Sequence, residues 1–341
     1  MRLFLHIGHG KTGSSFLQSW LAANADLITS RTSLIYPLSA PGDAITDPRA
    51  LQGRFSQGNG ALLDSLLKQR DRPQRLRRWV RSLAQERSLI GSDLNGLVFS
   101  FEGWAKQFDA MVEALMALAD VWEVECVEVF LVVRDPLEHA CSVYSQVVKR
   151  HGYTGSLDQW LQTYAFPNRL LRALKAMASA GSRLHLRAIH YGRQRQHLVR
   201  ECQSWLGLDP VDTWVSPQTQ RVNRSLTLDE LELMRVLNSL IGDAAAVVGE
   251  HLVDRLPDLV AAVIKPSDQI VDFFLRRWAE PVHLINTYLP ASAHLQLLEL
   301  ASSGHSESAP DLSQEVCLSM AQLQCLVDGL IDADVLLRSR S

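Results

Sequence analysis

The chain has 341 residues, of which 47% are hydrophobic and 21% are charged, and its formal net charge is −3. This balance is typical of a globular chain that can bury a full core, and it excludes a general attraction to nucleic acid or to an anionic membrane. The five cysteines are scattered without a C-x-x-C pair, so neither a disulfide framework nor a zinc motif is expected.

The start of the chain predicts a buried strand, a tight turn and a helix. Residues 3–7, Leu-Phe-Leu-His-Ile, form a short and mostly apolar run of the kind found in parallel sheets. Ser14 or Ser15 is expected to cap the helix that follows. Three glycines between strand and helix remove side chains where the backbone must approach another group closely: Gly8, Gly10 and Gly13.

This turn is expected to bind a phosphate or a similar anion. A helix N-terminus offers N–H groups and the positive end of a dipole, and Lys11 adds a charge. The loop of nucleoside triphosphatases has the pattern G-x-x-x-x-G-K-[ST]. Here Gly10-Lys11-Thr12 supplies the end of that pattern, but Leu5 stands five residues before Gly10, inside the strand. The turn is therefore too short to wrap two phosphates as a triphosphatase does.

Residues 39–95 are predicted to form a helical insertion, on the side of the core where a second substrate, the acceptor, would bind. Residues 33–37 are typical of a short edge strand that is ended by a proline, and residues 61–90 show helical spacing of apolar residues. The second of these helices begins at Pro73 and is rich in arginine. Its basic face either binds an acidic acceptor such as a polysaccharide or is simply solvated.

Glu102 ends the next predicted strand, residues 96–102. In an open α/β sheet, the residues just past the carboxyl ends of the strands line the ligand crevice. Glu102 is therefore expected near Lys11 if their strands are parallel neighbours. It would act there as a general base that takes the proton of an acceptor hydroxyl. The alternative is a structural carboxylate that pairs with a lysine or caps the next turn.

A second strand-to-helix turn follows residues 127–133, the strongest strand in the sequence. Arg134 comes directly after this strand, Asp135 can cap the next helix, and Pro136 suits its first position. Ser142 lies eight residues after Arg134. If both strands share one parallel sheet, the two anion sites share one crevice. A ligand with two separate phosphate-like groups is then expected, such as a 3′,5′-bisphosphorylated nucleotide.

The rest of the chain predicts one more strand and then helices. Residues 182–191 predict a strand that ends at Tyr191. The motif Thr227-x-x-Glu230 is a capping box that opens a helical region, and residues 313–338 predict a final amphipathic helix.

Two of these stretches resemble motifs of the sulfotransferases that use 3′-phosphoadenosine 5′-phosphosulfate. Residues 11–17, Lys-Thr-Gly-Ser-Ser-Phe-Leu, fit that family's 5′-phosphosulfate loop, which is near K-[TS]-G-[TS]-[TS]-x-L. Residues 134–144 fit its 3′-phosphate pattern, which is near R-[DN]-P-x-x-x-x-x-S-x-Y. The resemblance covers roughly residues 1–226 and implies the family's P-loop-like α/β fold, a central and mostly parallel sheet flanked by helices. Residues 227–341 are then a helical C-terminal region packed on the core, which could shape the acceptor cleft or form a homodimer.

The resemblance also implies an activity and the residues that carry it. A sulfuryl group is transferred in line from the donor to an acceptor hydroxyl, which leaves adenosine 3′,5′-bisphosphate and needs no metal. Lys11 would stabilise the departing oxygen and Glu102 would be the base, with His9 and His6 as rivals, although His6 is expected inside the sheet. The donor-binding residues would be Lys11, Thr12, Gly13, Ser14, Ser15, Arg134, Ser142, Tyr191 beside the adenine and, from a loose match, Arg224.

Two other functions fit parts of the same pattern. A small-molecule kinase would bind ATP with Mg²⁺, but residue 134 is an arginine where such an enzyme would place a metal-binding aspartate. A relative without catalytic activity would bind the nucleotide without turnover. Because no signal peptide or membrane anchor precedes residue 3, we expect a cytoplasmic and bacterial enzyme. With the basic helix, this favours a carbohydrate or glycolipid acceptor.

Overall fold

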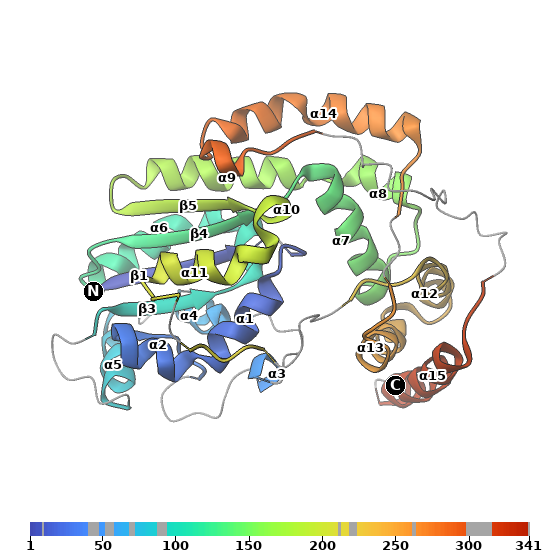
Figure 1. The fold of residues 1–341 in the computed structure, drawn as a ribbon, viewed down its shortest axis with the longest axis horizontal. Coiled ribbons are helices and arrows are strands. Elements are labelled where there is room, and N and C mark those ends of the chain that lie inside the picture. The colour runs from blue at the N-terminus through green and yellow to red at the C-terminus, as the bar shows by residue number, and fades with distance from the viewer. Residues whose placement is uncertain are drawn as a thin grey trace. The chain divides into compact units, whose positions relative to one another are not determined.

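The computed structural model describes residues 1–8, 10–39, 48–51, 58–67, 72–86, 94–210, 213–217, 224–260, 264–297 and 316–339. The chain packs into two compact units (Figure 1). Unit 1 comprises Met1–Arg134, Phe166–Val222 and Pro281–Leu295, and unit 2 comprises Asp135–Ala165, Asn223–Glu280 and Gln296–Ser341. The expected boundary after residue 226 lies close to one of these junctions, but unit 2 also takes a segment from the middle of the expected core.

Unit 1 is built on a parallel sheet, as the sequence predicts. Its strands are β1 (Arg2–Gly8), β2 (Leu34–Ile35), β3 (Gly96–Ser100), β4 (Val127–Val133) and β5 (Leu184–His190). The order across the described sheet is β2-β3-β1-β4-β5, and every neighbouring pair is parallel. All five carboxyl ends therefore point to the same edge, with the end of β1 between those of β3 and β4.

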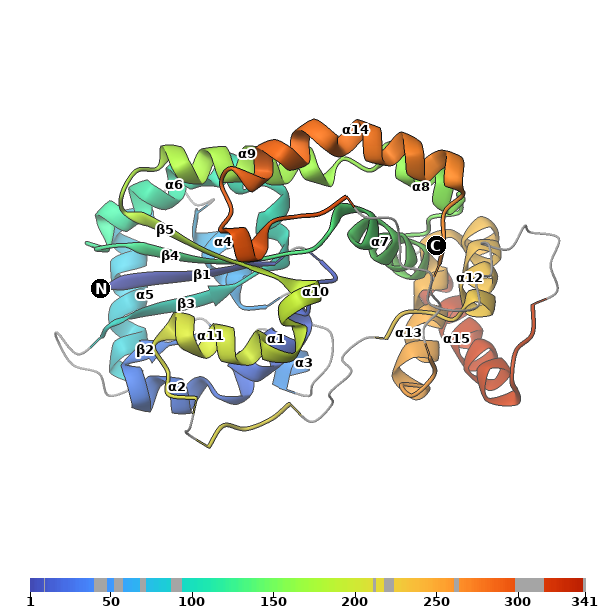
Figure 2. The same cartoon turned by 45° about the horizontal axis from the view of Figure 1, so that its top comes forward.

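Helices cover both faces of this sheet (Figure 2). One face carries α1 (Ser14–Ala23), α2 (Ala25–Thr32), α3 (Pro48–Leu51) and α11 (Leu198–Leu206). There the Trp205 ring centroid lies 5.4 Å from that of Phe4 and 5.2 Å from that of Phe130, so α11 is held on β1 and β4. The other face carries α4 (Gly60–Leu67), α5 (Arg72–Glu86), α6 (Phe108–Val121) and α9 (Phe166–Ser179), with Trp79 of α5 stacked on Phe99 of β3 at 5.9 Å.

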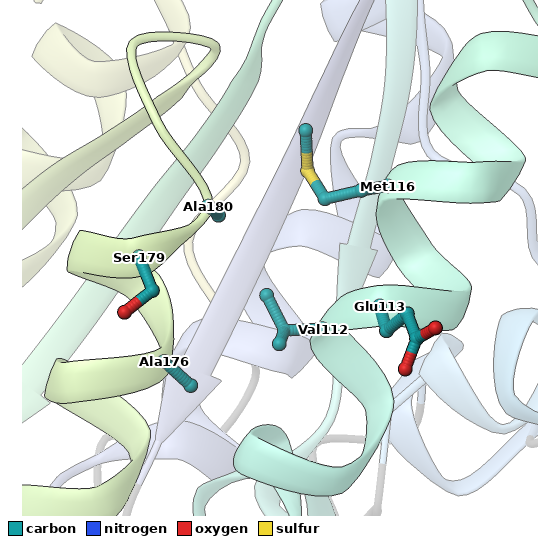
Figure 3. A pocket seen from close by; sticks show the side chains of 6 residues that line it. All are labelled: Val112, Glu113, Met116, Ala176, Ser179 and Ala180. Atoms are coloured by element: carbon teal, nitrogen blue, oxygen red, sulfur yellow. The ribbon is translucent and has the colours of Figure 1, made fainter.

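A small pocket opens between α6 and α9 (Figure 3). Its lining is mostly apolar and consists of Val112, Glu113, Met116, Ala176, Ser179 and Ala180. None of these is a candidate residue from the sequence, and the pocket lies on the helices rather than at the carboxyl edge of the sheet.

Unit 2 is helical. It contains α7 (Pro136–Arg150), α8 (Leu157–Thr163), α12 (Leu228–Ile241), α13 (Ala246–Arg255), the first part of α14 (Asp268–Asn286) and α15 (Met320–Arg338). The predicted capping box opens α12, because the Thr227 hydroxyl accepts from the Glu230 backbone N–H while the Glu230 carboxylate accepts from the Thr227 N–H. The final helix is also confirmed, and it begins at Met320.

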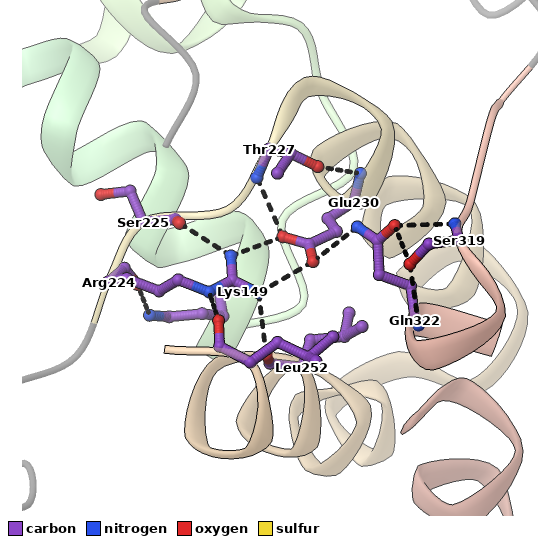
Figure 4. Close-up of polar contacts among 9 residues, drawn as sticks. Lys149, Arg224, Ser225, Thr227, Glu230, Leu252, Ser319 and Gln322 are labelled. Carbon is purple, nitrogen blue, oxygen red and sulfur yellow. Dashed lines mark hydrogen bonds and ion pairs between the residues drawn. The ribbon is translucent and has the colours of Figure 1, made fainter. Parts of the chain in front are cut away.

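A buried ion pair joins the helices of unit 2 (Figure 4). Arg224 donates to both carboxylate oxygens of Glu230, at 2.7 and 2.8 Å. Gln322 of α15 donates to the same carboxylate at 2.9 Å, and Lys149 of α7 donates to the Arg224 carbonyl at 3.1 Å. Burial alone would raise the pKa of Glu230, but the hydrogen bonds from Arg224, Gln322 and Thr227 together hold it below its ordinary value.

Candidate active site

The turn between β1 and α1 depends on two glycines. A Cβ added to Gly8 would lie 2.0 Å from the Ser14 hydroxyl oxygen, so only glycine lets the start of α1 approach the end of the strand. Gly13 has a φ of +80° and lies against α11 and Tyr191, where an added Cβ would approach Leu198 Cδ2 to 2.7 Å and Tyr191 Cε2 to 2.9 Å. The backbone is therefore close-packed where the sequence predicts an anion site.

The cap of α1 differs from the prediction. Neither Ser14 nor Ser15 is the N-cap, which is Gly13, a residue without a side-chain cap. Ser14 is buried over Gly8 instead, and its hydroxyl lies 3.4 Å from that of the buried Thr12. Glycine has no side chain that could accept from the first N–H groups of α1.

Lys11 and Arg134 are brought together at this edge. Arg134 follows β4, the direct neighbour of β1, and its Nη1 donates a hydrogen bond to the Lys11 carbonyl oxygen at 3.1 Å. Lys11 itself has a φ of 68°, in the left-handed region that non-glycine residues seldom adopt. The side chain of one predicted cationic residue thus contacts the backbone of the other, although the two lie 123 positions apart in the sequence.

Tyr191, which directly follows β5, lies at the same edge of the sheet. It begins the short helix α10 (Tyr191–Gln194), and its ring packs against Gly13. The Arg134 guanidinium carbon lies 5.7 Å from the ring centroid, and that of Arg195 lies 5.8 Å away, both within cation–π range. Two positive charges are therefore gathered around the Tyr191 ring, beside the glycine turn.

Glu102 lies at the carboxyl end of the strand on the other side of β1. It begins the 3₁₀ helix η2 (Glu102–Lys106) directly after β3, and the Phe101 N–H donates to the His6 carbonyl oxygen at 3.2 Å. The condition for Glu102 to approach the Lys11 turn, that β1 and β3 are parallel neighbours, is met. The predicted base and the predicted cations thus come from three adjacent strand ends.

The two histidines proposed as rival bases have different outcomes. His6 is fully buried in β1, as expected, with its Nδ1 2.7 Å from the Ser100 hydroxyl oxygen. Burial lowers the pKa of His6 to about 3, so the ring is neutral and a poor base near neutral pH. His9 lies outside the described residues.

Two predicted donor-binding residues belong to unit 2. Ser142 lies on α7, and its role remains a prediction from the sequence pattern. Arg224 has five N–H donors, and all five are used within unit 2, by Glu230 and by the carbonyl oxygens of Ser225, Leu252 and Leu256. Because its side chain is also 3% exposed, Arg224 is a structural residue, and we do not include it in the candidate site.

Sequence reasoning missed two residues at this edge of the sheet. Arg195 lies beside Tyr191 because the chain turns through α10 into the 3₁₀ helix η3 (Arg195–His197), which places positions four apart on one side. Leu198, the first residue of α11, packs against Gly13. The helical spacing from Tyr191 could have indicated Arg195, but the contact between Leu198 and Gly13 has no local signal.

Comparisons with known proteins leave the family open. No protein-family model matches the chain, and no curated protein matches it. Among solved structures, the sulfotransferase domain from the curacin biosynthetic pathway is similar over 82% of this chain and 97% of that domain, with 13% identity and a TM-score of 0.33. A similarity this low does not indicate an activity for this chain. In the described part of the chain, no helix is both long and apolar enough to cross a membrane.

Proposed function

We propose that the chain is a sulfotransferase that takes the sulfuryl group of 3′-phosphoadenosine 5′-phosphosulfate and passes it to an acceptor hydroxyl. The hydrogen bond from Arg134 to the Lys11 backbone carries the proposal. A donor with phosphate groups at both its 5′ and 3′ positions needs two cationic sites within the span of one nucleotide. The contact between these two turns supports that requirement, and the short glycine turn disfavours a triphosphatase loop.

Each side chain at the edge has a role in this proposal. The N-terminus of α1, with Lys11, Thr12, Ser14 and Ser15, holds the 5′-phosphosulfate. The Arg134 guanidinium binds the 3′-phosphate through charge-assisted hydrogen bonds. The Tyr191 ring lies against the adenine, and Arg195 adds positive charge beside it. The packing of Tyr191 against Gly13 supports this assignment, because it places the ring beside the turn that would hold the 5′-phosphosulfate.

The reaction needs one base and one cation. The acceptor oxygen attacks sulfur in line with the phosphate oxygen that leaves, the bond between sulfur and that oxygen breaks, and its electron pair remains on the phosphate. The Lys11 ammonium stabilises the negative charge that develops on the leaving oxygen. The Glu102 carboxylate takes the proton of the acceptor hydroxyl. A metal is not required for any of these roles.

Calorimetry separates this proposal from its rivals. The whole protein is titrated with adenosine 3′,5′-bisphosphate in the presence of a chelator, and with ATP and Mg²⁺ in a second series. We expect tight binding of the bisphosphate without metal, and weaker binding of ATP. Preference for ATP with Mg²⁺ would favour the kinase. Binding of the bisphosphate without any sulfuryl transfer across a broad acceptor panel would favour the relative that lacks catalytic activity.

An acidic carbohydrate or glycolipid is the acceptor class that we favour. Among the side chains of helix α5 that the structure describes, Arg77, Arg78 and Arg81 are exposed, which fits the basic face expected from the sequence. An acceptor panel should therefore pair each neutral saccharide with a carboxylated counterpart. Faster transfer to the acidic member, reduced when Arg78 and Arg81 are changed to serine, would support this class, and equal rates would contradict it.

A further inference from the structure

Three metal-ligating side chains converge at the amino edge of the sheet, opposite the candidate active site. Cys126 immediately precedes β4, Glu128 is the second residue of β4, and His185 is the second residue of β5. Cys126 and Glu128 are two positions apart and so share a face, and Glu128 is the register partner of His185. Their ligand atoms all lie within 4.8 Å of one another.

The distances suit a small divalent ion with borderline-soft ligands. Cys126 Sγ lies 3.4 Å from Glu128 Oε1, and His185 Nδ1 lies 3.1 Å from the same oxygen. Zinc bonds of about 2.0–2.3 Å arranged as a tetrahedron place ligand atoms about 3.3–3.6 Å apart. Two of the three separations are therefore within a few tenths of an ångström of those in a zinc site. Thiolate, imidazole and carboxylate are also the three ligand types that zinc binds.

The hydrogen bond on the far side of the His185 ring strengthens this interpretation. Nε2 lies 3.1 Å from the Ser182 carbonyl oxygen, which can only accept, so Nε2 carries a hydrogen. In a neutral ring, Nδ1 then presents a lone pair to the Glu128 carboxylate, which can also only accept. The contact is therefore favourable when a proton or a metal ion lies between these two atoms. Histidine ligands of metals typically donate their other N–H to a backbone carbonyl in this way.

We propose that Cys126, Glu128 and His185 form a three-ligand site for a zinc-class divalent cation that links β4 to β5. The order of the described sheet makes β5 an edge strand, so the ion would fix that edge. The His185 side chain is 55% exposed, which lets water complete the coordination. Arg2 and Glu125 also lie near the thiol, and Glu125 is paired with the N-terminal ammonium group of Met1 at 3.0 Å.

Cys126 and His185 both have raised pKa values in this cluster. Burial, and then the hydrogen bond to Glu128, raise the pKa of the Cys126 thiol to about 11, and the hydrogen bond with Glu128 raises the pKa of His185. Metal binding would therefore displace a proton from the thiol and compete with one on the ring. The sequence pattern did not predict this site, because its ligands come from two strands without a C-x-x-C motif.

Cobalt(II) is a direct probe of this site. The whole protein, reduced and freed of metal by a chelator, is titrated with Co²⁺. We expect one equivalent to give the visible bands of tetrahedral cobalt and a near-ultraviolet thiolate-to-cobalt band, and one equivalent of Zn²⁺ to bleach both. The melting temperature should rise with Zn²⁺. Absence of the thiolate band would overturn the proposal.

Variants show which residues bind the ion. Cys126→Ser should abolish the thiolate band, and His185→Gln should weaken Co²⁺ binding at least about tenfold. Cys317→Ser, which removes an exposed thiol in unit 2, is the matched control and should bind as the wild type does. His185 is exposed, so His185→Gln also remains informative if Cys126→Ser fails to fold. Unchanged binding in His185→Gln, or loss of the band in Cys317→Ser, would contradict the assignment.

Discussion

Arg134 donates a hydrogen bond to the backbone of Lys11, with its Nη1 3.1 Å from the carbonyl oxygen. The contact joins the turn after β4 to the turn after β1, and it holds Lys11 where the backbone has a φ of 68°. A left-handed conformation at a non-glycine residue costs about 1–2 kcal/mol and persists only where neighbouring groups fix it. In the proposed site, Arg134 would therefore order the first anion-binding turn as well as form the second.

Replacing Arg134 should weaken donor binding chiefly through the 3′-phosphate. Hydrogen bonds to charged groups contribute about 1.5–3 kcal/mol, so Arg134→Ala should bind adenosine 3′,5′-bisphosphate about 10- to 150-fold more weakly. Arg134→Lys should be intermediate, because lysine keeps the charge but loses the planar fork. Calorimetry with adenosine 5′-phosphate, which lacks the 3′ group, measures how much of the loss is specific.

The control for Arg134 is an arginine at the opposite edge of the sheet. Arg183 forms a surface ion pair with Asp120 and donates to the Val124 carbonyl oxygen. Arg183→Ala should leave nucleotide binding unchanged. If Arg134→Ala kept the wild-type preference for the bisphosphate over adenosine 5′-phosphate, the assignment of the 3′-phosphate to Arg134 would be wrong.

Gly13→Ala should damage both the fold and the site. An alanine there has an unfavourable backbone at φ +80° and forces a Cβ against Leu198 and Tyr191. The first effect costs about 1–2 kcal/mol and the overpacking about 1–3 kcal/mol more. Displacement of Tyr191 should also weaken binding of adenosine 3′,5′-bisphosphate. Chemical denaturation and calorimetry measure the two losses.

Gly181 provides a matched control for the effect of the backbone alone. Its φ is +83°, nearly that of Gly13, but an added Cβ would meet nothing within 4 Å. Gly181→Ala should lose only the roughly 1–2 kcal/mol that the unfavourable backbone conformation costs, and it should bind the nucleotide normally. Equal losses of stability in the two variants would show that the packing around Gly13 is unimportant.

Glu102→Gln should depress turnover far more than donor affinity. The amide keeps the size of the side chain but cannot accept the acceptor proton, and general base catalysis contributes typically about 10²–10⁴-fold. Single-turnover transfer and bisphosphate binding measure the two effects separately. Glu113→Gln, which changes an exposed glutamate of α6, is the control. Unchanged turnover in Glu102→Gln would move the base elsewhere, with His9 as the remaining candidate.

The sheet and the two turns could be predicted because their signals are local. Apolar runs mark β1, β3, β4 and β5, and glycines or an arginine at each strand end mark the turns. Parallel pairing then brings Glu102, Lys11, Arg134 and Tyr191 to one edge without any further information. The prediction required only that these strands be neighbours, and they are.

Predictions failed where the answer depended on contacts distant in sequence. Ser14 is as good a helix cap as Gly13 in sequence terms, but Gly8 leaves a space that the Ser14 hydroxyl fills, so Ser14 is buried instead. Arg224 follows the strands in a basic loop, as a donor-binding arginine would. Its donors are nevertheless all used by Glu230 and by carbonyl groups of nearby segments, including Leu252 on α13, and no spacing in the sequence indicates that arrangement.

Acidification should destabilise the protein through His6. Its pKa is about 3 in the folded chain and about 6.5 when unfolded, so the unfolded state binds the extra proton first. The effect of His6 on the free energy of unfolding does not change with pH above about pH 6.5. Below that pH, the free energy of unfolding falls by about 1.4 kcal/mol per pH unit. His6→Gln should therefore show a shallower loss between pH 6.5 and 4 in urea unfolding. Phe4→Leu, equally buried on β1, should lower stability without changing that slope.

The Arg224–Glu230 pair should dominate the stability of unit 2. Glu230→Gln leaves a buried guanidinium without its counter-charge, and breaking a buried pair in this way costs about 3–5 kcal/mol. Because the pKa of Glu230 is lowered in the folded chain, its contribution is present above the unfolded value and is lost as the pH falls through the folded one. The variant should therefore be less stable at pH 7 and lose less on acidification.

Hydrogen exchange of α12 and α15 resolves this loss from changes in unit 1, since Gln322 joins α15 to the same carboxylate at 2.9 Å. Amide protection should fall in both helices of Glu230→Gln while β1 and β4 remain protected. The control is Asp334→Asn, which removes the partner of Arg338 in an exposed pair on α15 and should change protection little. Equal effects of the two substitutions would mean that the buried pair contributes no more than a surface one.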